Sequence, residues 1–162
     1  RILIKGEEFG RRHPGGFMRA SGDYEVSEVQ DYTGKRFITY AGWASDFSRN
    51  IILPMQRQAI ETYCNKNKIE YSDYQFENDH CDWQPSLEYF IREKPDGIVL
   101  CSMYALTDDH ERRNELLNLA LELGVELHFA NELCSLKTKN DLAKLEMYLN
   151  FAVQKSEPYV WE

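Results

Sequence analysis

From residue 36 onward, short hydrophobic runs alternate with longer segments in which hydrophobic residues recur every three or four positions. The hydrophobic runs predict four strands, at Phe37–Ala44, Ile69–Phe76, Ile98–Met103 and Val125–Ala130. The segments with helical spacing predict four helices, at Pro54–Lys66, Pro85–Glu93, Asp108–Leu123 and Asn140–Lys155. Strands that alternate with helices predict an α/β fold, with a mainly parallel sheet covered by helices on both faces in three layers.

Individual residues indicate where these elements begin and end. Pro54 suits the first position of a helix. Asp108 and Glu111 have the spacing of a capping box, and Gly124 follows the same helix where a C-terminal cap belongs. The run Ile98–Met103 is almost wholly apolar, which is typical of a strand buried on both faces.

The first 35 residues differ from the rest of the chain. They hold most of its glycines and few periodic hydrophobic positions, apart from a short predicted strand at Arg1–Lys5 and a possible hairpin around Gly22. The predicted organisation is therefore an extended N-terminal arm over residues 1–35, an α/β domain over 36–156 and a C-terminal tail over 157–162.

Charge and composition exclude some classes of protein. The chain has 162 residues and a formal net charge of −8, which argues against nucleic acid as the main partner because phosphate binding needs clustered Lys and Arg. No hydrophobic run is long enough to span a membrane, and the start lacks a signal-peptide pattern. The four cysteines form no CxxC pair. We expect reduced thiols in a cytoplasmic protein that contacts no membrane.

Polar residues follow each predicted strand, at the edge of the sheet where α/β domains carry their sites. His128 lies inside an apolar strand, where a packed core histidine is the simplest interpretation, and Arg112 and Arg113 are equally consistent with a solvated helix face. The candidate catalytic residues are Ser45, Glu77, His128 and Glu132. The candidate binding residues are Arg49, Gln56, Ser102, Tyr104, Arg112 and Arg113.

No metal ion or cofactor is expected. His80 stands beside Asp79 and Cys81, but no further residue has ligand spacing. The segment His13-Pro14-Gly15-Gly16 resembles the haem loop of cytochrome b5, yet the next histidine is His80, too distant to be the second axial ligand. No glycine-rich nucleotide-binding signature follows a predicted strand.

The region from Tyr40 to about Phe151 resembles the catalytic domain of serine recombinases, the resolvases and invertases. The segment Tyr40–Ser45 is similar to the family's Tyr-x-Arg-Val-Ser opening, and Ile98–Leu106 to the strand before its Asp-Arg-x-x-Arg motif. The resemblance implies a resolvase-like or flavodoxin-like fold and a serine that attacks a DNA phosphodiester with the help of arginines. This chain lacks the family's arginines. The residues at the positions of the two family motifs are Gly42, Tyr104, Ala105 and Asp108.

A second resemblance is to the bacterial "sporadic carbohydrate cluster" proteins, over about 110 residues. Its pattern matches Gly42, Ser45, the segments Pro54–Gln58 and Tyr63-Cys64, Glu77, Ser102, Arg112 and the strand Leu127–Glu132. This family implies a role in making a surface polysaccharide or O-antigen sugar, without naming a reaction.

Three functions remain open from the sequence. The first is a protein of surface-carbohydrate synthesis that binds a sugar or nucleotide sugar at the strand ends, without a nucleic-acid partner. The second is a non-catalytic homo-oligomeric scaffold or regulatory partner, a homodimer or larger, that associates through the arm and the last helix. The third is a degenerate serine-recombinase domain. We expect the first.

Overall fold

The computed structural model describes residues 2–3, 25–26, 30–42, 51–77 and 82–156, without the side chains of residues 2–3, 25–26, 73 and 151–156. The chain divides into two units, Arg1–Asp31 and Tyr32–Glu162. In the first unit, β1 (Ile2–Leu3) pairs antiparallel with β2 (Glu25–Val26). The predicted turn around Gly22 and most of the predicted arm lie outside the described residues.

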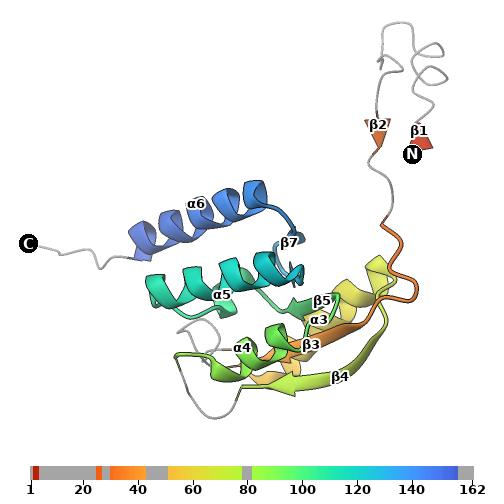
Figure 1. Ribbon diagram of the computed structural model, residues 1–162, viewed down its shortest axis with the longest axis horizontal. Coiled ribbons are helices and arrows are strands. Elements are labelled where there is room, and N and C mark those ends of the chain that lie inside the picture. Colours follow the sequence, from red (N-terminus) through yellow and green to blue (C-terminus); the bar gives the residue numbers. More distant parts are fainter. Residues whose placement is uncertain (1, 4–24, 27–29, 43–50, 78–81, 157–162) are drawn as a thin grey trace, which may run out of the picture. The chain divides into compact units, whose positions relative to one another are not determined.

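The second unit is built on a five-stranded sheet with the order β4-β3-β5-β6-β7 (Figure 1). Its strands are β3 (Phe37–Ala41), β4 (Tyr71–Phe76), β5 (Gly97–Leu100), β6 (Glu126–Phe129) and β7 (Cys134–Leu136). The first four strands run parallel and β7 runs antiparallel to β6. The predicted α/β class with a mainly parallel sheet is therefore confirmed.

Helices cover both faces of this sheet, which confirms the predicted three layers. The helical elements are α3 (Leu53–Asn67), α4 (Pro85–Arg92), the 3-10 turn η1 (Met103–Ala105), α5 (His110–Leu123) and α6 (Lys139–Ser156). On one face, the ring of His128 in β6 packs against Tyr63 of α3. On the other face, Tyr40 of β3 packs against Phe90 of α4, and α4 lies beside α5 (Figure 1).

The core is centred on the parallel strands, because their side chains are buried on both faces. Ile98, Leu100 and Phe129 have no exposed surface. Gly97 starts β5 where a Cβ atom would lie 2.3 Å from the ring of Phe37. The two strands can pair in this register only because residue 97 has no side chain.

The structure differs from the predicted elements in three places. The predicted strand Ile98–Met103 ends at Leu100 and gives way to η1. The N-cap of α5 is Asp109, whose carboxylate accepts a hydrogen bond from the backbone of Arg112, and not Asp108. Strand β7 was not predicted, because three residues at a sheet edge are too few to show a period.

Candidate functional site

The carboxyl ends of β3, β4, β5 and β6 meet at one edge of the sheet, here called the strand-end edge. Of the predicted site residues, Glu77, Ser102, Tyr104 and Glu132 follow these strands, and Gln56 reaches the same edge from the first turn of α3. Ser45 and Arg49 lie outside the described residues. What the edge can do chemically depends on the partners that these side chains already have.

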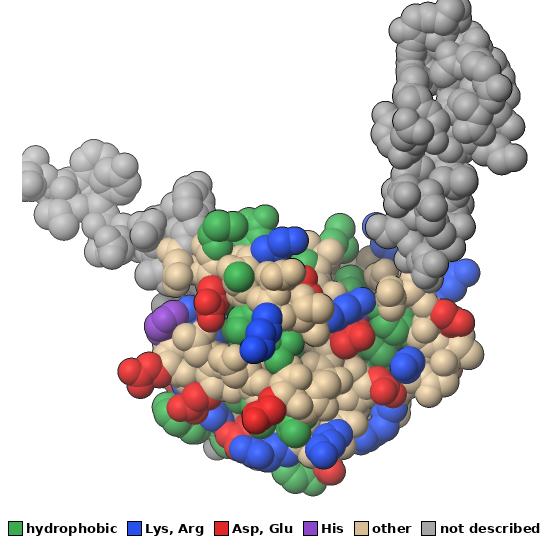
Figure 2. Space-filling view, turned by 45° about the horizontal axis from the view of Figure 1, so that its top comes forward, with side chains coloured by type: hydrophobic (Ala, Val, Ile, Leu, Met, Phe, Trp, Pro, Cys, Tyr) green, Lys and Arg blue, Asp and Glu red, His purple; other side chains and the backbone are tan. Residues whose placement is uncertain are grey.

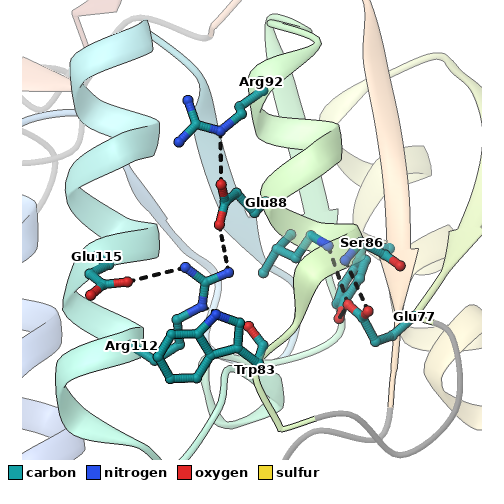
Figure 3. Close-up of polar contacts among 9 residues, drawn as sticks. Glu77, Trp83, Ser86, Glu88, Arg92, Arg112 and Glu115 are labelled. Carbon is teal, nitrogen blue, oxygen red and sulfur yellow. Dashed lines mark hydrogen bonds and ion pairs between the residues drawn. The ribbon is translucent and has the colours of Figure 1, made fainter.

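Glu77 is buried and acts as the N-terminal cap of α4. Its carboxylate accepts hydrogen bonds from the hydroxyl of Tyr40 at 2.8 Å and from the backbone N–H groups of Ser86 at 2.9 Å and Leu87 at 3.2 Å (Figure 3). A carboxylate at a helix N-terminus also lies at the positive end of the helix dipole. The oxygens of Glu77 are therefore occupied by fold-forming donors.

Glu132 plays a similar part for η1. Its carboxylate accepts a hydrogen bond from Ser102 Oγ at 2.6 Å and another from the backbone N–H of Met103 at 2.8 Å. Ser102 Oγ in turn accepts from the backbone N–H of Tyr104. Burial, followed by the charge of Glu132, raises the pKa of the Tyr104 hydroxyl. The oxygens of Glu132, like those of Glu77, are therefore occupied by donors of the fold.

Gln56 is fully buried and ties α3 to the end of β3. Its side-chain amide donates to the carbonyls of Gly42 at 3.1 Å and Ile51 at 2.9 Å. Its oxygen accepts from the Sγ–H of Cys101 at 3.8 Å. Burial raises the pKa of the Cys101 thiol to about 12, so Cys101 is not a thiolate nucleophile.

Gly42 stands where the resemblance to serine recombinases places an arginine, and a side chain there would crowd Tyr40 and Glu77. A Cβ atom on Gly42 would lie 2.8 Å from the hydroxyl oxygen of Tyr40 and 3.1 Å from Cβ of Glu77. A larger residue at position 42 would therefore displace the Tyr40 hydroxyl from its hydrogen bond with Glu77.

Arg112 lies between α4 and α5, where it serves packing. Its guanidinium donates to the carbonyl of Trp83 at 2.7 Å, to Glu88 at 2.7 Å and to Glu115 at 3.2 Å (Figure 3). It also lies 4.7 Å from the centre of the Trp83 ring, a cation–π contact. Hydrogen bonds from Arg92 and Arg112 lower the pKa of Glu88, so the carboxylate stays ionised.

Arg113 is buried on the same helix. Its guanidinium contacts the carbonyl of Thr107 at 3.4 Å and Nδ1 of His110 at 3.3 Å, and its Nε has no hydrogen-bond partner. Burial lowers the pKa of Arg113. Both arginines lie in the first turn of α5, beyond the end of β5, and their contacts are to the loops before α4 and α5 and to side chains of those helices.

His128 lies on the α3 face of the sheet and is almost completely buried. Its Nδ1 is 2.7 Å from the hydroxyl of Tyr63, and its Nε2 is 2.8 Å from the carboxylate of Glu126. The rings of Tyr32 and Phe37 pack edge-on against it. The packed core histidine is thus the interpretation that the geometry supports.

A groove of about 430 Å³ runs along α3 beside the turn after β6. Met55, Ala59 and Tyr63 line it from the helix, and Leu133 lines it from the turn. Sequence reasoning missed this groove. Met55, Ala59 and Tyr63 have helical spacing, which by itself indicates a face packed against the core. In the structure Met55 is 57% exposed, so part of this face lines the groove.

The described residues contain neither a metal-binding cluster nor a membrane-crossing helix. Within them, no three His, Cys, Asp or Glu side chains gather closely enough to hold a metal ion. None of the helices in that part of the chain is long and apolar enough to cross a membrane.

Known structures with a similar fold include an integrase catalytic domain and a site-specific recombinase. One is the N-terminal catalytic domain of TP901-1 integrase, at 12% identity and a TM-score of 0.54, covering 76% of this chain and all of that one. Another is a resolvase family site-specific recombinase from Streptococcus pneumoniae, at 11% identity and a TM-score of 0.54, covering 75% of this chain and 89% of that one. No family model and no curated protein sequence matches this chain.

These comparisons confirm the resolvase-like fold and correct the predicted function. The similar folds are recombinase domains, and no family match supports the carbohydrate-cluster resemblance. The predicted role in surface-polysaccharide or O-antigen synthesis, with a sugar or nucleotide sugar as ligand, is therefore wrong, and so is the expectation that nucleic acid is not a partner. The negative net charge does not decide whether nucleic acid is a partner, because a total charge does not show how the charges are distributed.

Proposed function

We propose that this chain is a degenerate serine-recombinase domain, which associates with DNA but does not cut it. The fold likeness supports the association with DNA. The observation that carries the loss of cleavage is Gly42, which offers no cation where the resemblance places an arginine and whose Cβ position would lie 2.8 Å from the Tyr40 hydroxyl that bonds to Glu77.

The chemistry of strand cleavage supports the same conclusion. A serine that attacks a phosphodiester needs cations nearby, because negative charge grows on the phosphate oxygens in the transition state. The described side chains at the strand-end edge include the carboxylates Glu77 and Glu132 and the neutral amide Gln56, all held by hydrogen bonds within the fold. Arg112 is engaged by two carboxylates between α4 and α5. Among the side chains described at this edge, Glu77 and Glu132 would repel a phosphate, and Arg112 is already paired with carboxylates.

A domain of this kind would act in the cytoplasm. The cysteines suit a reducing compartment, since Cys64, Cys101 and Cys134 are free thiols. Burial raises the pKa of Cys64 to about 12 and that of Cys134 to about 11, so these thiols are unreactive.

The association with DNA is tested by fluorescence anisotropy with a labelled 30-base-pair duplex, at 50 and 200 mM salt. We expect binding in the range of about 1 to 100 μM, weaker at the higher salt, as for sequence-independent contacts to phosphates. Failure to bind at the highest protein concentration in low salt would refute this part of the proposal.

The absence of cleavage is tested separately with supercoiled plasmid and Mg²⁺, using the full chain and the variant Ser45→Ala. Neither protein should produce nicked or linear DNA. Nicking by the unmodified chain that disappears in Ser45→Ala would show a working serine nucleophile, and the domain would then be an active recombinase.

A further inference from the structure

Three helices end at the opposite edge of the sheet, where the parallel strands begin, and all three end with a left-handed residue. These residues are Lys68 after α3 (φ 56°), Lys94 after α4 (φ 55°) and Gly124 after α5 (φ 72°). The backbone N–H of each one donates to a carbonyl three residues earlier. The next residue in each case, Ile69, Pro95 or Val125, is buried. The caps of α3 and α5 share a second hydrogen bond, from Ile69 to Cys64 and from Val125 to Ala120, which Pro95 has no N–H group to make after α4.

Glycine is the residue best suited to this cap, because it adopts a positive φ without a steric penalty from a Cβ atom. The end of α5 has the glycine, whereas α3 and α4 have exposed lysines. Attraction to the negative end of the helix dipole does not require these lysines, because Lys66 and Arg92 already lie in the last turns of α3 and α4. The caps therefore give no structural reason for Lys68 and Lys94.

Other basic side chains lie at the same edge. Lys35 and Arg36 precede β3, are exposed, and line a depression of about 250 Å³ together with Glu70 and Tyr71. The guanidinium of Arg36 donates to the backbone carbonyl of Glu93, next to Lys94 in the chain. Figure 2 shows Lys and Arg side chains, with some acidic ones among them, at the end of the molecule where the strands begin.

The four basic side chains share this edge with four acidic ones, Glu70, Glu93, Asp96 and Glu126. Asp96 accepts a hydrogen bond from the backbone N–H of Arg36 at 2.7 Å. Glu93 pairs with the hydroxyl of Tyr89, an interaction that raises the pKa of that tyrosine. Glu70 shares the depression with Lys35 and Arg36.

We propose that Lys35, Arg36, Lys68 and Lys94, here called the basic rim, contact the phosphate backbone of duplex DNA. This inference rests on the proposed association with DNA and places the contact at the edge opposite the strand ends. Lys68 extends the rim on the α3 face of the sheet and Lys94 extends it on the α4 face, with Lys35 and Arg36 at the start of β3 between them. Exposed cations on both sides of the sheet suit an extended anion such as duplex DNA better than a small phosphate compound.

The test uses the full chain with the double substitution Lys68→Gly and Lys94→Gly. Glycine should improve both caps, so the melting temperature should rise, while DNA affinity at 0.1 M salt should fall about tenfold or more. The slope of log affinity against log salt concentration should decrease by about 2, one for each lysine that contacts a phosphate. The matched control is Lys139→Gln with Lys144→Gln, which removes the same charge from exposed positions of α6.

Three results would overturn the basic rim. Equal losses of affinity in the rim variant and the α6 control would show an effect of net charge alone. Unchanged affinity and salt slope in the rim variant, with binding by the unmodified chain, would refute the rim and leave the proposed function standing. If the unmodified chain does not bind duplex DNA, the proposed function and the rim both fail. A raised melting temperature together with a rim-specific loss of affinity supports the proposal.

Discussion

The two ends of the parallel sheet use their polar residues in opposite ways. At the strand-end edge, Glu77 and Glu132 are held by backbone N–H groups and hydroxyls of the fold. At the other edge, Lys68 and Lys94 are exposed in a backbone conformation that favours glycine. The polar residues at the first edge are needed for folding, whereas the lysines at the second edge oppose it slightly. A polar residue that the fold does not need is the better candidate for function.

This contrast changes how a strand-end site is interpreted in such a fold. Ligands of open α/β sheets bind beyond the carboxyl ends of the strands, so polar residues there suggest chemistry. The same location also holds the starts of α4 and η1, whose backbone N–H groups need acceptors. In this chain Glu77 and Glu132 satisfy that need. Position in the fold therefore shows where a site could form, and hydrogen-bond partners show whether the side chains are available.

The largest effect is expected for Glu77→Ala, which tests the structural role of the strand-end edge. The substitution removes the carboxylate that accepts from the Tyr40 hydroxyl and from two backbone N–H groups of α4, so the free energy of unfolding should fall by about 3 kcal/mol. Urea unfolding measures the change. The control is Glu70→Ala at the opposite edge, an exposed glutamate whose loss should stay within about 0.5 kcal/mol. Similar effects of the two substitutions would contradict the structural role of Glu77.

Arg112→Ala should have the next largest effect. It removes the contacts to the Trp83 carbonyl and ring and leaves Glu88 without its partner on α5, so we expect a loss of about 2 kcal/mol of stability. Arg112→Lys should restore little of it, since an ammonium group cannot make the same set of planar contacts.

The matched control for Arg112 is Arg92→Ala, which removes the other partner of Glu88. The Arg92 side chain is 59% exposed, against 5% for Arg112, so its ion pair should contribute less than about 0.5 kcal/mol. Loss of DNA binding in Arg112→Ala without a change in stability would instead give Arg112 a direct role in binding.

Gly124→Lys would sharpen the comparison between the helix ends. It places a lysine in the third left-handed cap, and the free energy of unfolding should fall by about 1 kcal/mol because of the added Cβ atom. This change in the free energy of unfolding measures how much stability the chain loses by having lysine and not glycine at positions 68 and 94. A neutral or stabilising Gly124→Lys would show that lysine suits these caps, and the argument from their backbone conformation would then fail.

The smallest expected effect concerns pH. A hydrogen bond from His128 lowers the pKa of Glu126 in the folded protein. A depressed folded-state pKa stabilises the fold above the unfolded value of about 4.3, and this stabilisation is lost as pH falls through the folded-state pKa. Glu126→Gln should therefore lose less stability than the unmodified chain between pH 6 and pH 3 in thermal unfolding. An unchanged acid dependence would show that Glu126 contributes no such stabilisation.

The incorrect functional prediction came from residues that turned out to be structural. The resemblance to carbohydrate-cluster proteins relied on Tyr63, Glu77, Ser102 and the strand Leu127–Glu132. In the structure, Tyr63 bonds to His128, Glu77 caps α4, and Ser102 bonds to Glu132. Residues of this kind recur wherever the same helix starts and core contacts recur. They therefore indicated a shared fold and not a shared ligand.

The sequence by itself determined the α/β class, the parallel strands and most element positions, because burial imposes a period of two or of three to four on the residues of each element. It also brought Glu77, Ser102 and Glu132 to one edge, since parallel strands end together. Short elements such as β7 and the change from β5 to η1 left no such period.

Only the tertiary structure decided how the polar residues are used. The carboxylate of Glu77 meets donors from β3 and α4, and Arg112 meets partners from α4 and α5, so both depend on contacts between distant parts of the chain. The left-handed backbone at Lys68 and Lys94 depends on where each helix stops against the sheet. Hydrogen-bond partners and helix ends depend on which residues come close together in space. The hydrophobic pattern of the sequence does not contain this information.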